Sequence, residues 1–326
     1  MRNFTFKGLF LTAVFMLLGC FSIQAADDDL ITKQITINLD KAGTLPNKIA
    51  SSEMYKITNL KIIGEINGTD WNMIREMAGR DNRGYGTEGK LSVLDLSEAK
   101  IVKGGDSYYS GDNCYTSNDE IGEYAFKDCS RLTSLTLPVG ITSIGYDAFD
   151  GCSGLTSLTL PAGITSIGEY AFSGCSGLTS LTLPAGITSI DKCAFSGCSR
   201  LTSLTLPAGI TSIGEFAFSY CSGLTSIYVY AEKVPRIGRY AFEGCASRKC
   251  TLYVPKGTYD NYRLSEFGYF ENIVEFDATG IDKTTTSTDV EEVSRYSLNG
   301  QRLAVPVKGL NIVKYSDGSA RKVVVK

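Results

Sequence analysis

The stretch GCSGLTSLTLPAGITSI, residues 151–167, recurs letter for letter at residues 174–190, and it returns at residues 197–213 with one change, Arg200. The copies are 23 residues apart. A fixed period of this length is typical of a solenoid, in which each coil buries its apolar face only against its neighbours. The sequence therefore predicts an elongated stack of coils.

The same period extends on both sides of these copies. Isoleucine, phenylalanine and cysteine each recur once per coil, at Ile121, Ile144, Ile167, Ile190, Ile213 and Ile237, at Phe126, Phe149, Phe172, Phe195, Phe218 and Phe242, and at Cys129, Cys152, Cys175, Cys198, Cys221 and Cys245. The last step in each column is 24 residues, which places a one-residue insertion near Val234 and Pro235.

Each coil contains three segments with different patterns. In residues 155–160, LTSLTL, the last two leucines alternate with polar residues, as a half-buried strand requires. Pro161 ends that strand because it has no amide hydrogen to donate. A second short strand is expected at residues 164–167, and residues 168–177 form a polar turn that includes the phenylalanine and the cysteine. We therefore predict a β-rich solenoid of 23-residue coils with two narrow parallel sheets.

The full pattern is L-x-x-L-x-L-P-x-x-I-x-x-I-x-x-x-A-F-x-x-C, over about residues 121–276. It resembles the BspA-like, treponeme-type leucine-rich repeats of bacterial surface proteins. The resemblance continues upstream, where WNMIREM at residues 71–77 precedes the strand-like LSVLDL at residues 91–96. It implies binding of proteins on host or neighbouring cells, or a role in adhesion.

The chain divides into five parts. They are a signal peptide at residues 1–26, an α+β N-terminal cap at residues 27–90, a leucine-rich-repeat solenoid with its C-terminal cap at residues 91–276, a linker at residues 277–289, and a small β module at residues 290–326. Within the first cap we expect Thr69 or Asp70 to begin a helix that ends at Gly79. The last part resembles the C-terminal sorting modules of type IX (Por) secretion, which implies delivery to or across the outer membrane.

The first 26 residues predict export. Arg2 and Lys7 precede an apolar run at residues 8–18, which is too short to be a permanent membrane span. Signal peptidase could cut after Ala25 or Ala26. Alternatively, LLGC at residues 17–20 is a lipoprotein box in which Cys20 is acylated. Both interpretations place the protein at the cell surface, in the outer membrane or outside the cell.

Ten cysteines in an exported chain would normally suggest disulfides. Equivalent side chains in stacked coils point the same way, and parallel Cβ vectors do not favour a disulfide between neighbours. We therefore interpret the cysteine column as buried free thiols. Cys193 stands where other coils carry Tyr170 or Phe216, and we interpret Cys193 as another core filler. Cys114, Cys245 and Cys250 could still pair at the edges of the domain.

The composition argues against catalysis. The chain contains no histidine, which removes Ser-His-Asp and Cys-His mechanisms and every histidine-containing metal site. It has no CxxC pair for an all-cysteine zinc site. A net charge of −3 without a basic stripe gives no electrostatic basis for nucleic-acid binding. We expect no enzyme activity, no cofactor and no metal.

A specific contact surface is expected where the repeats differ. The outward Thr-Ser-x-Thr positions are the same in coil after coil, which suits a soluble scaffold surface or a weak repeated ligand such as a polysaccharide. The polar loop at residues 103–119 and the aromatic fifth strand are different, and tyrosine supplies large contact area at small entropic cost. The candidate contact residues are Tyr108, Tyr109, Tyr115, Tyr228 and Tyr230. A surface loop without a partner and an aromatic cover for the cap are the structural alternatives.

Three functions follow from these observations. The first is a monomeric, non-enzymatic recognition or adhesion module for protein partners. The second is a carbohydrate-binding accessory that uses the threonines or the tyrosines. The third is a passive spacer.

Overall fold

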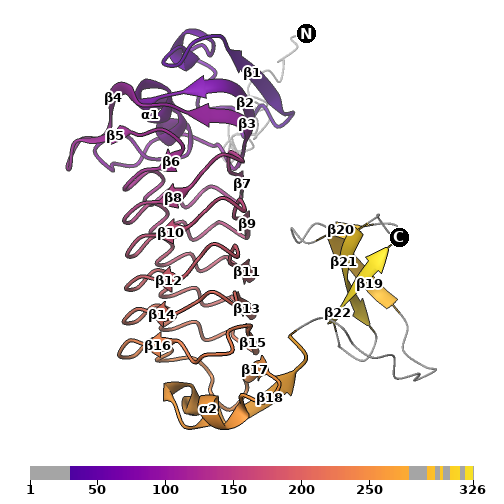
Figure 1. The fold of residues 1–326 in the computed structure, drawn as a ribbon. Coiled ribbons are helices and arrows are strands. Elements are labelled where there is room, and N and C mark those ends of the chain that lie inside the picture. Colours follow the sequence, from indigo (N-terminus) through magenta and orange to yellow (C-terminus); the bar gives the residue numbers. More distant parts are fainter. Residues whose placement is uncertain (1–29, 279–291, 298–301, 304–308, 316–319, 326) are drawn as a thin grey trace, which may run out of the picture.

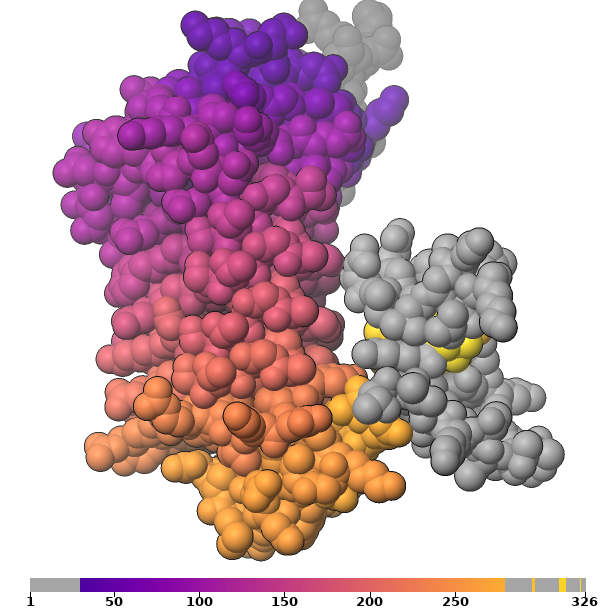
Figure 2. All heavy atoms as spheres, in the orientation of Figure 1, coloured from indigo at the N-terminus to yellow at the C-terminus, as the bar shows by residue number. Residues whose placement is uncertain are grey.

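The computed structural model describes residues 30–278, 292–297, 302–303, 309–315 and 320–325. The predicted signal peptide, Cys20 and most of the predicted linker lie outside these residues. A stack of coils runs between two caps (Figure 1), and the space-filling view shows it as one continuous column (Figure 2).

The N-terminal cap supplies three parallel strands, β1 (Ile35–Leu39), β2 (Asn59–Ile66) and β3 (Val93–Ile101), together with the helix α1 (Gly68–Met77). The helix begins after Asn67, whose side chain accepts a hydrogen bond from the amide of Thr69, so the expected cap at Thr69 or Asp70 is wrong. Asp70 lies in the first turn instead, where its carboxylate accepts from the amides of Asn67, Gly43 and Leu45. These bonds tie the 3-10 turn η2 (Leu45–Asn47) to the helix.

The strands of the coils form two narrow parallel sheets. The first sheet runs from β3 through β7 (Ser134–Thr136) to β9 (Ser157–Thr159). After a break it resumes with β11 (Ser180–Thr182), β13 (Ser203–Leu206), β15 (Ser226–Val229), β17 (Thr251–Pro255) and β18 (Asn272–Phe276). The second contains β6 (Glu120–Ile121), β8 (Ser143–Ile144), β10 (Ser166–Ile167), β12 (Ser189–Ile190), β14 (Ser212–Ile213) and β16 (Arg236–Ile237). Equivalent residues pair across coils, Leu135 with Leu158 and Ile144 with Ile167. The predicted solenoid is confirmed.

The turn side of the stack carries a third ladder of main-chain hydrogen bonds. The amides of Phe126, Phe149, Phe172, Phe195 and Phe218 donate to Ala148, Ala171, Ala194, Ala217 and Ala241 of the following coil at 2.7 or 2.8 Å. Both sheets are interrupted between the coil of β9 and β10 and the coil of β11 and β12. The turn ladder crosses that step through Phe172, so it is the most continuous element of the stack.

Two side-chain columns fill the interior beside this ladder. The rings of Phe126, Phe149, Phe172, Phe195, Phe218 and Phe242 stack at centroid distances of 4.9 to 5.5 Å and within 14° of parallel. The thiols of Cys152, Cys175, Cys198, Cys221 and Cys245 each donate to the phenylalanine carbonyl of the preceding coil at 3.0 to 3.4 Å. All nine described cysteines are free, including Cys114, Cys245 and Cys250.

The N-terminal cap replaces a missing coil. Within the stack, the carbonyls of Tyr146 and Ala148 accept from amides of the preceding coil. The equivalent carbonyls of the first coil belong to Glu123 and Ala125. Glu123 accepts from the Tyr108 hydroxyl at 2.9 Å, and Ala125 accepts from Trp71 Nε1 and from Arg75, both at 3.0 Å. Buried side-chain donors of the cap therefore make the hydrogen bonds that these carbonyls of the first coil would lack without a preceding coil.

At the other end, the helix α2 (Tyr259–Arg263) and the 3-10 turn η3 (Glu266–Tyr269) cover the last coil. Phe267 and Phe270 pack against Phe242 at 5.8 and 5.3 Å, and the Tyr262 hydroxyl donates to the Ala231 carbonyl at 2.6 Å. The aromatic segment thus closes the stack.

The C-terminal part forms its own four-stranded antiparallel sheet in the order β20-β19-β21-β22. Its strands are β19 (Glu292–Ser297), β20 (Arg302–Leu303), β21 (Gly309–Tyr315) and β22 (Ala320–Val325). Its described residues have the β structure that the sequence predicted.

The phenylalanine column should dominate stability. Phe172 is fully buried between two parallel rings, so Phe172→Ala should lower the free energy of unfolding by about 3–5 kcal/mol through the cavity it leaves. Urea unfolding measures this, with Thr159→Ala on the exposed sheet face as the matched control. A loss below about 1 kcal/mol would mean that the register is misassigned.

The buried thiols should make stability fall in alkali. Burial raises the pKa of Cys129 to about 11 and raises the pKa of Cys152 and Cys175 well above the ordinary value. In the unfolded chain these thiols ionise near pH 9, so the unfolded state binds fewer protons than the folded state above that pH. Stability is therefore fully present below about pH 9 and declines as pH rises toward the folded pKa, by about 1.4 kcal/mol per thiol at pH 10.

Urea unfolding under reducing conditions at pH 8 and pH 10 measures this decline. The double variant Cys152→Ala and Cys175→Ala should show a shallower pH dependence than the parent. Equal slopes would contradict the assignment of these thiols as neutral buried donors.

Candidate recognition surface

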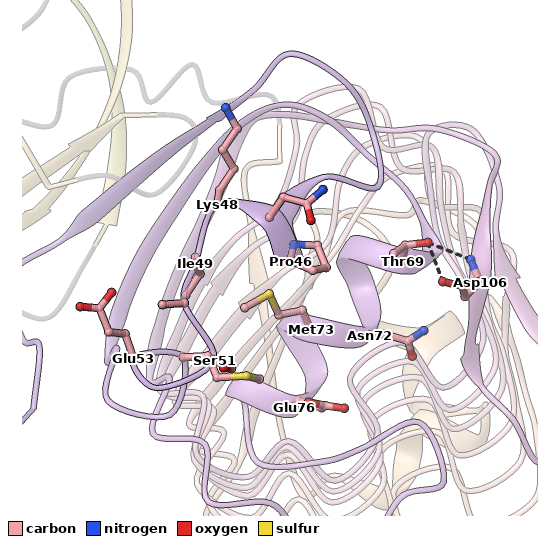
Figure 3. Close-up of a pocket in the computed structure, with 13 residues that line it drawn as sticks. Pro46, Lys48, Ile49, Ser51, Glu53, Thr69, Asn72, Met73, Glu76 and Asp106 are labelled. Carbon is pink, nitrogen blue, oxygen red and sulfur yellow. Dashed lines mark hydrogen bonds between the residues drawn. The ribbon is translucent and has the colours of Figure 1, made fainter.

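A hollow with a volume of about 760 Å³ lies in the N-terminal cap. Residues 46–54 and one side of α1 line it, and Met73 lies between them (Figure 3). Burial, together with the nearby charge of Asp81, raises the pKa of Glu76. Lys48, Glu53 and Glu76 point in different directions (Figure 3), so this hollow has no convergent set of charged groups.

Within residues 30–278 and the described strands of the tail, no three Cys, Asp or Glu side chains are grouped to hold a metal ion. None of the described helices is long and apolar enough to cross a membrane.

Tyr108 does not belong to a contact surface, and its prediction as a contact residue is wrong. It lies on β4 (Gly104–Tyr109) with 1% of its surface exposed, and its hydroxyl donates into the first coil. Burial raises its pKa, so it stays a neutral donor. The alternation of β4 directs this side chain inward, where it serves the cap.

The other two tyrosines of the loop lie at the surface. Tyr109 is half-buried, and its ring stacks on that of Tyr124 at 4.6 Å and 9° from parallel. Tyr115, on β5 (Cys114–Thr116), is 57% exposed. Their role in binding stays a prediction.

Tyr228 and Tyr230 lie at the opposite end of the stack, on and after β15 (Figure 1). Tyr228 stacks on Tyr253 at 4.4 Å, and Phe276 meets Tyr228 and Tyr230 edge-on at 6.0 and 5.1 Å. These half-buried rings cover the last strands, so they do not join the loop tyrosines in one site.

The structure reveals a longer aromatic feature along the turn side. We define the aromatic row as Tyr109, Tyr124, Tyr146, Tyr170, Phe216 and Tyr240. Neighbouring rings contact at 5.5 Å between Tyr124 and Tyr146, at 5.8 Å between Tyr146 and Tyr170, and at 5.3 Å between Phe216 and Tyr240. Cys193 takes the position between Tyr170 and Phe216. The row therefore follows the stack coil by coil.

A left-handed backbone position directs most of these side chains outward. Tyr124, Tyr170, Phe216 and Tyr240 have φ between 55° and 59°. Bulky residues rarely adopt this conformation because it crowds the Cβ atom. In the second coil the residue at this left-handed position is Asp147, with φ 52°, and the ring of the row belongs to the residue before it, Tyr146.

The interpretation of Cys193 as a core filler is confirmed, since it is 9% exposed, whereas Tyr170 and Phe216 at the same position are half exposed. These residues stand two before the buried phenylalanine, and each of them has a positive φ. The aromatic residue that recurs just before Ala-Phe could have indicated an outward-facing row. The sequence alone, however, does not reveal the positive φ at that position.

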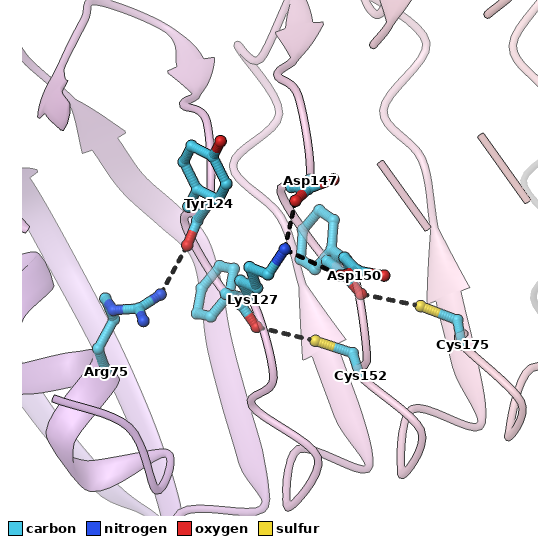
Figure 4. A network of polar contacts seen from close by, with 9 residues as sticks. Arg75, Tyr124, Lys127, Asp147, Asp150, Cys152 and Cys175 are labelled. Atoms are coloured by element: carbon cyan, nitrogen blue, oxygen red, sulfur yellow. Dashed lines mark hydrogen bonds and ion pairs between the residues drawn. The ribbon is translucent and has the colours of Figure 1, made fainter. Parts of the chain in front are cut away.

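The turn side is also the acidic side of the solenoid. Its six segments, each from the isoleucine to the cysteine of a coil, contain eight Asp and Glu and three Lys and Arg. One cation is held in place, since Lys127 contacts Asp147 and lies 3.1 Å from Asp150 (Figure 4). Burial lowers the pKa of Lys127, but its hydrogen bonds to the two carboxylates raise it overall.

The phenols of Tyr124 and Tyr146 stay protonated at neutral pH. Burial and the charges of Asp112 and Asp147 raise the pKa of Tyr124 to about 12. The charge of Asp147, with burial, raises the pKa of Tyr146. The row therefore offers neutral hydroxyl donors beside carboxylates.

Comparison with known proteins supports the repeat. Residues 119–249 match the family model described as BspA type Leucine rich repeat region, in six copies. No curated protein matches the chain.

Three solved structures are similar. A leucine-rich-repeat protein of T. pallidum is 29% identical, with 46% of this chain and 73% of that chain covered and a TM-score of 0.39. A leucine-rich cell surface protein of Faecalibacterium prausnitzii is 23% identical, with 68% and 51% covered and a TM-score of 0.34. A leucine-rich-repeat protein of Bacteroides ovatus is 23% identical, with 55% and 65% covered and a TM-score of 0.28. The fold assignment itself rests on the strand register of this chain.

The rings of the row should be dispensable for folding. Asparagine tolerates the left-handed region, so Tyr170→Asn or Phe216→Asn relieves backbone strain of about 1–2 kcal/mol. The same change loses a ring contact of about 0.5–1.5 kcal/mol. We expect the free energy of unfolding to change by less than about 1 kcal/mol in urea unfolding. A loss as large as that of Phe172→Ala would show that these rings belong to the core.

Proposed function

We propose that this chain is an exported surface protein that recognises a protein partner without catalysis, in adhesion or in contact with other cells. The aromatic row carries the proposal, because aromatic side chains are enriched where proteins bind one another. The match to BspA-type repeats supports it, as does the F. prausnitzii structure, which is described as a cell surface protein.

Export belongs to the same proposal. Residues 1–26 would direct it, with cleavage after Ala25 or Ala26 or with acylation of Cys20. The C-terminal sheet would act as a type IX sorting module. Its four short antiparallel strands are compatible with a small recognition unit at the end of the chain.

The carbohydrate alternative places the ligand on the Thr/Ser face, and one observation disfavours it. The threonine just before each of these strands donates its hydroxyl proton to a carbonyl within the stack. Thr156, Thr202 and Thr225 donate to the threonine carbonyl of the preceding coil at 3.0, 2.9 and 3.1 Å. These hydroxyls therefore stabilise the ladder and have no proton left for a ligand.

The test is an array of matrix proteins and glycans probed with residues 27–326. We expect a protein ligand. The double variant Tyr146→Asn and Phe216→Asn should weaken its binding tens of fold, since buried aromatic anchors contribute about 2 kcal/mol or more each. The triple variant Thr159→Val, Thr182→Val and Thr205→Val is the matched control and should bind like the parent.

Loss of binding only in the threonine variant would favour the repeating glycan ligand. An array without any ligand would favour the passive spacer. Unchanged binding in the aromatic variant would move the contact to the Tyr115 loop or to the Tyr228 end.

A further inference from the structure

We infer that the aromatic row binds an extended, positively charged polypeptide segment that lies parallel to the axis of the solenoid. The inference rests on the proposed function and adds the chemistry and the shape of the bound segment.

The shape follows from the spacing of the rings. The row has one aromatic residue in each coil except the fourth, where Cys193 takes the position, and it is one side chain wide. Stacked coils are about 4.8 Å apart, so the five steps from Tyr124 to Tyr240 span about 24 Å. An extended chain of about seven residues has this length. A narrow, straight row is complementary to such a segment, whereas a folded domain would need a broader patch around it.

The charge follows from the residues beside the rings. Glu123, Glu169 and Glu215 are exposed, and each directly precedes a ring of the row in alternate coils. With eight carboxylates and three cations on the turn side, this surface attracts a cationic segment and repels a polyanion.

The rings already accept cations from the chain itself. Arg75 lies 5.3 Å from the ring centroid of Tyr109, Lys127 lies 5.3 Å from that of Tyr124, and Arg239 lies 5.8 Å from that of Tyr240. These distances are within the range of cation–π attraction. Among the described residues, no cation lies over Tyr146 or Phe216, and both rings have an exposed glutamate nearby in the row. A Lys or Arg of the partner would contact a ring and a carboxylate together at these two places.

A neutral glycan fits this surface less well. Sugar rings stack on flat, exposed aromatic faces, and Tyr109 covers a face of Tyr124. Tyr124 and Tyr146 meet edge to face, at 70°. The row therefore presents ring edges, hydroxyls and carboxylates more than a series of open faces.

The test measures binding of three fluorescent probes to residues 27–326 by anisotropy. The probes are a nonapeptide of alternating Arg and Pro, the same peptide with Glu in place of Arg, and cellohexaose. Proline keeps both peptides extended. We expect the Arg-Pro peptide to bind and the other two not to bind, with affinity falling as salt rises from about 0.05 to about 0.3 M.

Two variants separate the contributions of rings and charges. Tyr146→Asn with Phe216→Asn should weaken binding about tenfold or more. Glu169→Gln with Glu215→Gln should weaken it several-fold and reduce the salt dependence. Thr159→Val with Thr182→Val is the control and should bind like the parent, and circular dichroism and urea unfolding verify that each variant is folded.

Absence of Arg-Pro binding, or binding that neither variant changes, would overturn the inference. Cellohexaose binding that depends on the rings would replace it with a glycan track. If the array's protein ligand still depends on the rings while the Arg-Pro peptide does not bind, the proposed recognition function stands and only the extended cationic segment is excluded.

Discussion

The amide of the buried phenylalanine in each coil donates to the alanine carbonyl of the next coil, and this bond organises the molecule. It holds neighbouring coils at a fixed separation even where both sheets are interrupted. That separation brings the phenylalanine rings into parallel contact, and it brings each thiol within reach of a carbonyl in the preceding coil. A ladder of this kind leaves hydrogen-bonding groups without a neighbouring coil at both ends. Caps are needed to cover these ends. Trp71, Arg75 and Tyr108 satisfy the first end with side-chain donors.

The same ladder explains how a repetitive core gives a varied outer surface. Two residues before each ladder phenylalanine the backbone takes a positive φ. At this position Tyr170 and Phe216 lie at the surface, whereas Asp147 and Cys193 are buried. The core requires no particular side chain at that position, as Asp147, Cys193 and Phe216 all occupy it. The threonine before each sheet strand recurs with its hydroxyl bonded to the preceding coil, while the turn ladder uses main-chain groups and leaves its outer side chains free to vary. Aromatic and acidic residues have gathered on the side where variation costs the fold least.

The sequence predicted the features that depend on periodicity. The isoleucine, phenylalanine and cysteine columns gave the register, and Pro161 gave the end of the first strand of its coil. It did not predict features that depend on contacts between distant segments or on local φ. Tyr108 and Tyr109 are adjacent in a tyrosine-rich loop, yet one is buried as a donor to Glu123 and the other begins the aromatic row. Arg75 looks like a surface residue of a short helix, and only the fold shows it bonded to the carbonyls of Tyr124 and Ala125.

We expect the outer side of the turn, and not the uniform sheet face, to be the surface that meets a partner. Hydroxyl-radical footprinting with mass spectrometry tests it at single residues, with and without the Arg-Pro nonapeptide. We expect reduced oxidation of Tyr146, Tyr170, Phe216 and Tyr240, and unchanged oxidation of Tyr115. Protection that falls on Tyr115 or on the leucines of the sheet strands, with the row unchanged, would contradict it.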